Sequence, residues 1–119
     1  MLSKPGVNTG LESTAIMKKM IYITQLIYIK EGQQEVFHQF EDIAIPTISK
    51  HNGRLLLRIQ PTDDCFIESN IEKPYEIHIV EFDSEQDFEN FKNDKERQKF
   101  LHLKDQSVKY ATLIQGTKI

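Results

Sequence analysis

The residues best able to do chemistry are a histidine, two arginines and two tyrosines within apolar segments. In a strand, every second side chain points to the same face. Arg54 and Arg58 are four positions apart, so both side chains are expected on one face of the sheet. Alternation in the neighbouring segments adds His78, Tyr22 and Tyr28 to that face. Forked guanidinium groups bind carboxylates, and a histidine changes charge near neutral pH. These five residues are therefore a predicted ligand-binding site, and the expected ligand is an apolar or aromatic carboxylate.

Each of these residues also has a purely structural interpretation. His78 can serve as a hydrogen-bonded residue of an interface, and both arginines can form ion pairs with Glu76 or Glu81 across the sheet. Glu81 ends an apolar segment, where it is either a carboxylate with a raised pKa or an ordinary residue beside a turn. His78 and Glu81 are the candidate catalytic residues, and the sequence does not decide whether either acts.

The sequence predicts neither a metal site nor a cofactor. The remaining histidines show no pair at metal-ligand spacing, and Cys65 is the only cysteine. Acidic neighbours disfavour a thiolate at Cys65. No glycine-rich phosphate loop or nucleophile elbow is present.

Composition limits the class of protein. A chain of 119 residues suits one domain, and 39% hydrophobic with 28% charged residues is typical of a globular one. A net charge of -3 argues against nucleic acid as a partner. The longest apolar run, residues 20–29, is shorter than the roughly 20 residues of a membrane span. With a single cysteine, these features predict a cytoplasmic protein without a membrane partner.

Three regions are expected along the chain. Residues 1–19 are polar, lack the apolar centre of a signal peptide, and are interpreted as a flexible tail. Either Met17 or Met20 is the true start, or the tail braces a partner subunit. Residues 20–116 are the predicted domain, and residues 117–119 are its C-terminal end.

The hydrophobic periodicity predicts four strands and two helical regions in the domain. Alternation with a period of two marks strands at residues 20–29, 54–60, 75–82 and 108–115. Helical spacing of apolar residues begins at Gln33 and should end near residues 51–53, with a kink or restart at Pro46. A second helix begins at Ser84, breaks near residues 93–94, and is followed by a short helix at residues 95–103.

The resulting strand-helix-strand-strand-helix-strand order is that of a ferredoxin-like α+β fold. Right-handed crossovers place both helices on one face of a four-stranded antiparallel sheet. The other face would carry a set of apolar residues: Tyr22, Leu26, Tyr28, Leu56, Val80 and Phe82. If the register of the strands moves by one, the alternate residues would lie there instead. Because such a face is too apolar for water, a homodimer packed sheet to sheet is expected.

Two stretches resemble a known superfamily. Residues 37–58 read F-x-x-F-x(5)-P-x-I-x-x-H-N-G-R-L-L-L-R, and residues 75–91 read Y-E-I-H-I-V-E-F-D-S-x-x-x-F-x-x-F. The pattern over residues 20–116 is similar to the dimeric α+β barrel superfamily, especially its small stand-alone members of unknown function. Antibiotic-biosynthesis monooxygenase-type domains are more distant. The chain departs from that pattern at Asn52, where relatives often carry a second glycine, and after Phe91, where they often carry a tyrosine segment.

The resemblance implies a dimeric α+β barrel more firmly than an activity. Three functions remain open from sequence: a small-molecule-binding protein, a cofactor-free enzyme of monooxygenase or isomerase type, and an interaction protein without a ligand.

Overall fold

The structure is a computed structural model that describes residues 19–119. The predicted tail, residues 1–19, lies outside these residues except for its last position. The strands are β2 (Ile21–Ile29), β3 (Gly53–Ile59), β4 (Glu76–Phe82) and β5 (Val108–Gly116). The helices are α1 (Gln34–Ile48), α2 (Glu85–Lys92), α3 (Lys95–Lys99) and α4 (Leu101–Ser107), with short 3-10 turns at Ser49–His51 and Asp63–Cys65.

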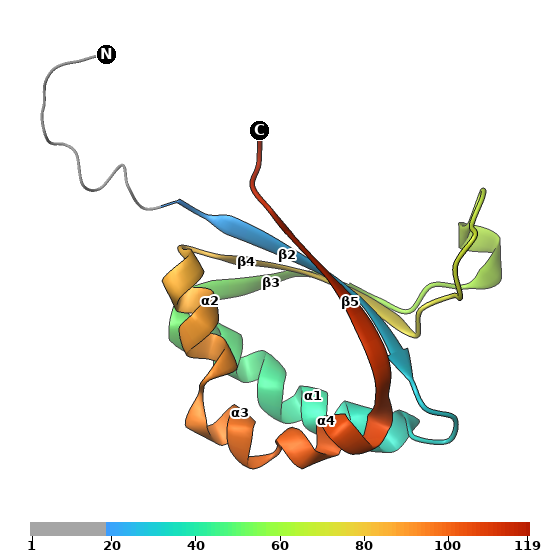
Figure 1. Ribbon diagram of the computed structural model, residues 1–119, viewed down its shortest axis with the longest axis horizontal. Coiled ribbons are helices and arrows are strands. Elements are labelled where there is room, and N and C mark those ends of the chain that lie inside the picture. The colour runs from blue at the N-terminus through green and yellow to red at the C-terminus, as the bar shows by residue number, and fades with distance from the viewer. Residues whose placement is uncertain (1–18) are drawn as a thin grey trace, which may run out of the picture.

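The four strands form one sheet in the order β3-β4-β2-β5, and every neighbouring pair is antiparallel. The four α-helices within residues 19–119 lie on one side of this sheet, and none of them covers the opposite face (Figure 1). The ferredoxin-like α+β fold predicted from the sequence is thus confirmed. The second helical region differs in detail, because it consists of three short helices.

The first crossover follows from the apolar stripe of α1. Phe37, Phe40, Ala44 and Ile48 recur at three- and four-residue spacing and are all buried against the sheet. The helix continues through Pro46 and then tightens into the 3-10 turn Ser49–His51. It ends as predicted at a left-handed residue, since Asn52 has a φ of 57°.

Side-chain caps set the start of α2 and of α3. The Ser84 hydroxyl accepts a hydrogen bond from the backbone N–H of Asp87 at 3.1 Å, which confirms the predicted cap. Asp94 caps α3 in the same way through the N–H of Arg97, at 3.0 Å. The chain therefore breaks between α2 and α3 where the sequence predicted, and after this break Arg97 lies against the rings of Phe91 and Phe40.

Close packing at the start of β3 explains why position 53 requires a glycine. A Cβ there would stand 2.5 Å from the Phe82 ring and 2.8 Å from Cγ2 of Ile48. We expect Gly53→Ala to lower the free energy of unfolding by about 1–3 kcal/mol, the usual range for overpacking, in urea titrations. Gly116→Ala is the control, because nothing lies within 4 Å of that added methyl group; an equal loss in both variants would contradict the packing argument.

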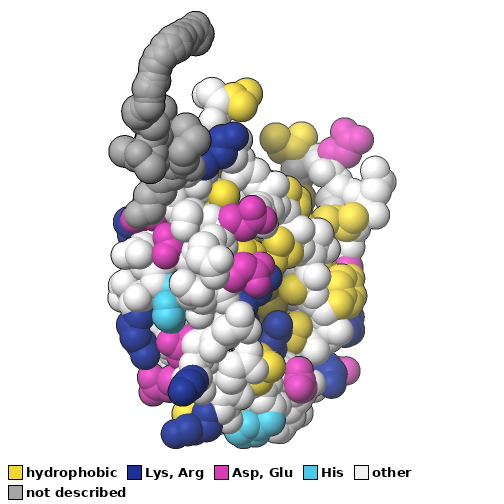
Figure 2. All heavy atoms as spheres, turned by 60° about the vertical axis from the view of Figure 1, so that its left-hand side comes forward, with side chains coloured by type: hydrophobic (Ala, Val, Ile, Leu, Met, Phe, Trp, Pro, Cys, Tyr) yellow, Lys and Arg dark blue, Asp and Glu magenta, His cyan; other side chains and the backbone are white. Residues whose placement is uncertain are grey.

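The sheet face away from the helices is apolar, but its residues differ from the set expected first. Val80 and Phe82 are buried under the helices, and the alternate residues of β4 face the other way. On that outer face Leu57 is 39%, Ile59 41% and Ile114 55% exposed. Figure 2 shows one side of the molecule on which hydrophobic side chains reach the surface among charged ones. No helix among residues 19–119 is long and apolar enough to cross a membrane.

Candidate functional site

A β-bulge in β3 divides the two arginines between the faces of the sheet. Arg54 pairs with Glu81 and Leu55 with Val80, but the next ladder pair is Leu57 with Ile79, so Leu56 is an extra residue. After the bulge Arg58 lies opposite His78. The predicted common face for Arg54 and Arg58 was wrong, because the spacing argument assumes an uninterrupted strand.

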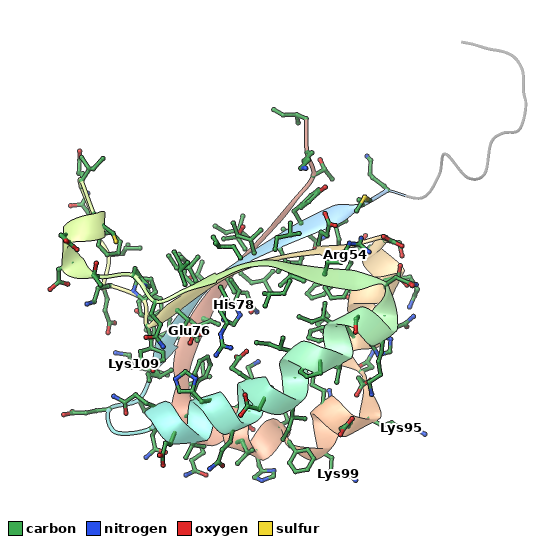
Figure 3. All side chains as sticks on the ribbon, turned by 180° about the vertical axis from the view of Figure 1, so that it is seen from behind. Arg54, Glu76, His78, Lys95, Lys99 and Lys109 are labelled. Carbon is green, nitrogen blue, oxygen red and sulfur yellow. The ribbon has the colours of Figure 1, made fainter. Side chains whose placement is uncertain are left out.

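On the helix side of the sheet, Glu76 forms four hydrogen bonds with three residues. Arg58 donates Nε–H to Oε1 at 2.9 Å and Nη2–H to Oε2 at 3.3 Å, which makes a forked ion pair. His78 Nε2 lies 2.7 Å from Oε1, and Gln60 donates to Oε2 at 3.2 Å. Glu76 is 2% and His78 4% exposed. Figure 3 shows both side chains on the side of the sheet that faces α1.

These contacts decide the charge of Glu76. Burial alone would raise the pKa of the carboxyl, but the hydrogen bonds from His78, Arg58 and Gln60 outweigh it and lower the pKa to about 2. Glu76 is therefore a carboxylate at neutral pH and only accepts hydrogen bonds. It follows that His78 donates from Nε2, and Nδ1 is the ring nitrogen that does not contact Glu76. No described residue donates a hydrogen bond to that Nδ1.

The cluster continues outward to the surface. Arg58 donates Nη2–H to His38 Nδ1 at 3.3 Å, and His38 Nε2 lies 2.8 Å from the hydroxyl of Tyr75. The His38 side chain is 37% exposed. The hydrogen bonds thus run without a break from a surface histidine on α1 to a buried histidine on β4.

His78 also lines a cleft between the sheet and the helices. The cleft holds about 60 Å³ of free space and is partly open to solvent. Its polar lining consists of Gln25, Glu41, His78 and Arg97. The rest is apolar and comes from β2, α1, β4 and α2: Ile23, Phe40, Ala44, Ile45, Ile48, Val80, Phe82, Phe88 and Phe91.

Glu41 is a buried carboxyl on the cleft wall. It is only 6% exposed, and within residues 19–119 it forms no hydrogen bond or ion pair. Burial raises the pKa of Glu41 to about 7. The negative charge of Glu76 acts in the same direction, whereas electrostatic interactions with His78, Arg58 and Arg97 lower this pKa. Near neutral pH the protonated and the ionised forms of Glu41 are therefore both populated.

Arg97 is another member of the polar lining. Its guanidinium stacks on Phe91 and Phe40, with Cζ 5.0 and 5.8 Å from the ring centroids, and Nη1–H donates to the carbonyl of Lys92 at 3.2 Å. Its Nε–H is buried and has no hydrogen-bond partner in the described part of the chain. An unpaired buried donor is costly, so this N–H is suited to an acceptor that enters the cleft.

The five predicted ligand-binding residues do not form one group. Tyr22, Tyr28 and Arg54 lie on the outer face, whereas His78 and Arg58 lie on the helix face. The Tyr28 hydroxyl donates to the carbonyl of Glu72 at 2.9 Å, and its ring stacks on Tyr110.

The catalytic candidate Glu81 lies on the outer face beside Arg54, away from the cleft. Arg54 forms ion pairs with Glu81 and with Asp83. Both arginines thus form the cross-strand ion pairs that the sequence offered as their structural role. Within residues 19–119, no group of three or more potential ligands could hold a metal ion.

Sequence reasoning missed Glu41, Glu76 and Arg97 as site residues. Glu41 had a readable signal, because it stands four residues after Phe37 and three before Ala44, inside the buried stripe of α1. An ionisable residue at such a position is a candidate for function. Arg97 had no such signal, since its place depends on the break between α2 and α3.

Comparison with known proteins shows similarity in structure alone. No protein-family profile matches the chain, and no curated protein matches its sequence. A protein of unknown function from Rhodopseudomonas palustris, RPA0582, matches with a TM-score of 0.72 and 14% identity, over 86% of this chain and 84% of that one.

Two further solved structures share the fold. A Dabb family protein with a ferredoxin-like fold from Mesorhizobium loti has a TM-score of 0.62 and 13% identity, over 84% of this chain and 97% of that one. A dimeric protein of unknown function with a ferredoxin-like fold from Bacteroides fragilis has a TM-score of 0.61 and 12% identity, over 83% and 96%. These likenesses confirm the ferredoxin-like fold implied by the resemblance to the dimeric α+β barrel superfamily.

Proposed function

We propose that the protein binds a small carboxylic acid with an apolar or aromatic body in the cleft between sheet and helices. The observation that carries this proposal is the buried, unpartnered Nε–H of Arg97 inside a lining of phenylalanines. The carboxylate would accept from Arg97, and the apolar body would contact Phe40, Phe88 and Phe91. The ligand class is the one expected from sequence, but its site is on the opposite side of the sheet from Tyr22, Tyr28 and Arg54.

Charge in the cleft favours a single negative group. The carboxylate of Glu76 is already neutralised by its forked pair with Arg58. Glu41, with a pKa of about 7, is protonated in a large fraction of molecules at neutral pH and then carries no repelling charge. Arg97 has no carboxylate side chain within ion-pair distance among the described residues, so its positive charge is open to a ligand.

The test uses 3-phenylpropanoate as the probe and its uncharged amide as the comparison. We expect the acid, but not the amide, to raise the melting temperature and to give a binding isotherm in calorimetry. Arg97→Met keeps the apolar stem and removes the charge, and it should weaken binding at least about tenfold, as expected for a hydrogen bond to a charged group.

The matched control is Lys99→Met on the same helix. Figure 3 shows Lys99 directed away from the cleft, and the residue is exposed. This variant should bind as the wild type does. Equal binding of acid and amide, or equal losses in both variants, would refute the proposed role of Arg97.

We also infer that two copies pack through the outer sheet face to form a homodimer. The face carries exposed Leu57, Ile59 and Ile114, and none of the helices in the described part of one subunit covers them. One of the structurally similar proteins, from Bacteroides fragilis, is described as dimeric. A second copy would cover both faces at once through an isologous contact.

Two neighbouring residues of β5 give a matched test of the dimer. Ile114 lies opposite Thr24 on the outer face, whereas Leu113 lies opposite Gln25 and points to the helix side. They are 55% and 45% exposed. We expect Ile114→Lys to sediment as a monomer and Leu113→Lys as a dimer. A monomeric wild type at micromolar concentration would contradict the inference.

A further inference from the structure

Three polar groups meet in the cleft, and each has a free chemical role. His78 presents an imidazole nitrogen, Glu41 a buried carboxyl and Arg97 a buried N–H donor, and none of these three positions has a hydrogen-bond partner in the described chain. They come from β4, α1 and α3, and all of them line the same cleft. A base, an acid and an anion-binding donor around one cavity are the parts of a proton-transfer site.

The base is oriented by its neighbours. The carboxylate of Glu76 holds Nε2–H of His78 at 2.7 Å and is itself fixed by Arg58 and Gln60. Such a carboxylate–histidine pair fixes the tautomer and turns Nδ1 away from Glu76. Glu76 is thus a positioning residue, whereas His78 and Glu41 are the groups that would touch a substrate.

Glu41 and Arg97 line the same cleft, so a molecule held at Arg97 by its carboxylate would also face Glu41. Glu41 and Arg97 interact electrostatically, but their charged atoms are not within ion-pair distance of each other. A carboxylate at Arg97 with a carbonyl on the adjacent carbon would bring that carbonyl oxygen toward Glu41. The next carbon, and its hydrogen, would then lie on the side of His78. This arrangement matches a 2-oxo acid with an apolar substituent.

We propose that the cleft catalyses the keto–enol interconversion of such a 2-oxo acid, with His78 as the base and Glu41 as the acid. Nδ1 of His78 takes the proton from the carbon next to the carbonyl, and the C–H electron pair becomes the carbon–carbon double bond. The carbonyl π pair moves to oxygen, which takes the proton of Glu41. A proton then returns from the imidazolium to the Glu41 carboxylate, so the enzyme is restored and the net reaction is an isomerisation without an oxidant.

The proposal rests on the proposed function, because it uses the same carboxylate site. The probe is phenylpyruvate in D2O, and the measurement is the rate at which the benzylic proton signal disappears in ¹H NMR, relative to buffer alone. We expect the protein to accelerate this exchange, and Glu41→Gln and His78→Gln each to lower the accelerated rate about 100-fold, within the usual contribution of general acid–base catalysis. Glu35→Gln, an exposed glutamate on the same helix, should keep the wild-type rate.

Binding of 3-phenylpropanoate, which has no carbonyl beside its carboxylate, separates the two proposals. If neither acid binds, the proposed function itself fails. If both bind and exchange proceeds at the buffer rate, only the proton transfer is refuted. Variants that still bind 3-phenylpropanoate and melt cooperatively are folded, so loss of exchange in them supports the assigned roles. Full exchange activity in both Glu41→Gln and His78→Gln overturns them.

Discussion

Glu41→Gln is expected to stabilise the folded protein by about 3 kcal/mol at pH 8 and to leave its stability nearly unchanged at pH 4. The pKa of Glu41 is about 7 in the folded chain and 4.5 as its ordinary value, and each unit of pKa shift corresponds to about 1.4 kcal/mol. A folded state that holds the proton more tightly loses stability as pH rises from 4.5 to 7. Glutamine imitates the neutral carboxyl and escapes that loss.

Urea titrations of both proteins between pH 4 and pH 8 measure this difference. The groups that face Glu41 are His78 and Glu76 on β4, Arg58 on β3 and Arg97 on α3, and all of them remain in the variant. Glu35→Gln on the exposed side of α1 is the control and should give a difference that does not vary with pH. A difference for Glu41→Gln that is equally flat would mean that the carboxyl is not buried in the way described.

Glu76→Ala should have the opposite effect, a loss of about 3 kcal/mol in the free energy of unfolding at pH 7. The change leaves Arg58 and His78 without their acceptor, and breaking a buried ion pair from one side typically costs about 3–5 kcal/mol. We expect the lower end because the Arg58 side chain is 31% exposed. The difference from wild type should shrink as pH falls below 4.5 toward 2, since the wild type then loses the contribution of its own carboxylate.

An exposed glutamate in a similar ion pair provides the control for that experiment. Glu72 forms an ion pair with Lys109, whose Nζ lies 2.9 Å from Oε2, but both side chains are about half exposed. Exposed pairs contribute little because water screens them and side-chain entropy opposes them. Glu72→Ala should therefore change stability far less than Glu76→Ala, and a comparable loss would show that burial is not what makes Glu76 important.

The order and type of the main elements followed from sequence because the periodicities were strong. The stripe of α1, the Ser84 cap and the left-handed Asn52 are local signals, and each was found where expected. The break before Asp94 was also local. These signals did not predict where α3 lies relative to the other elements. Its five residues are charged or polar, so the helix has no apolar stripe that would indicate which neighbour it contacts.

The prediction that the five site residues share one face was wrong for two physical reasons. First, both faces of β4 alternate with apolar residues, so periodicity alone could not say whether the face with Glu76 and His78 was the buried one. Second, the charged members of that face are buried because Arg58 neutralises Glu76, and this partnership depends on a bulge at Leu56. The three successive leucines at positions 55–57 were the one sign of this bulge in the sequence. A regular strand with one polar face alternates apolar and polar residues and would not have three leucines in a row.

The bulge has a consequence for how this chain is compared with others of its fold. The extra residue at Leu56 decides which of the residues after it in β3 point to the outer face and which to the helix face. A relative that lacks the extra residue would need an arginine at a position shifted by one to reach its own acid on β4. Sequence alignments of this strand should therefore open a one-residue gap at position 56 before any site residue is transferred, and ungapped alignments will equate outer-face residues with residues of the helix face.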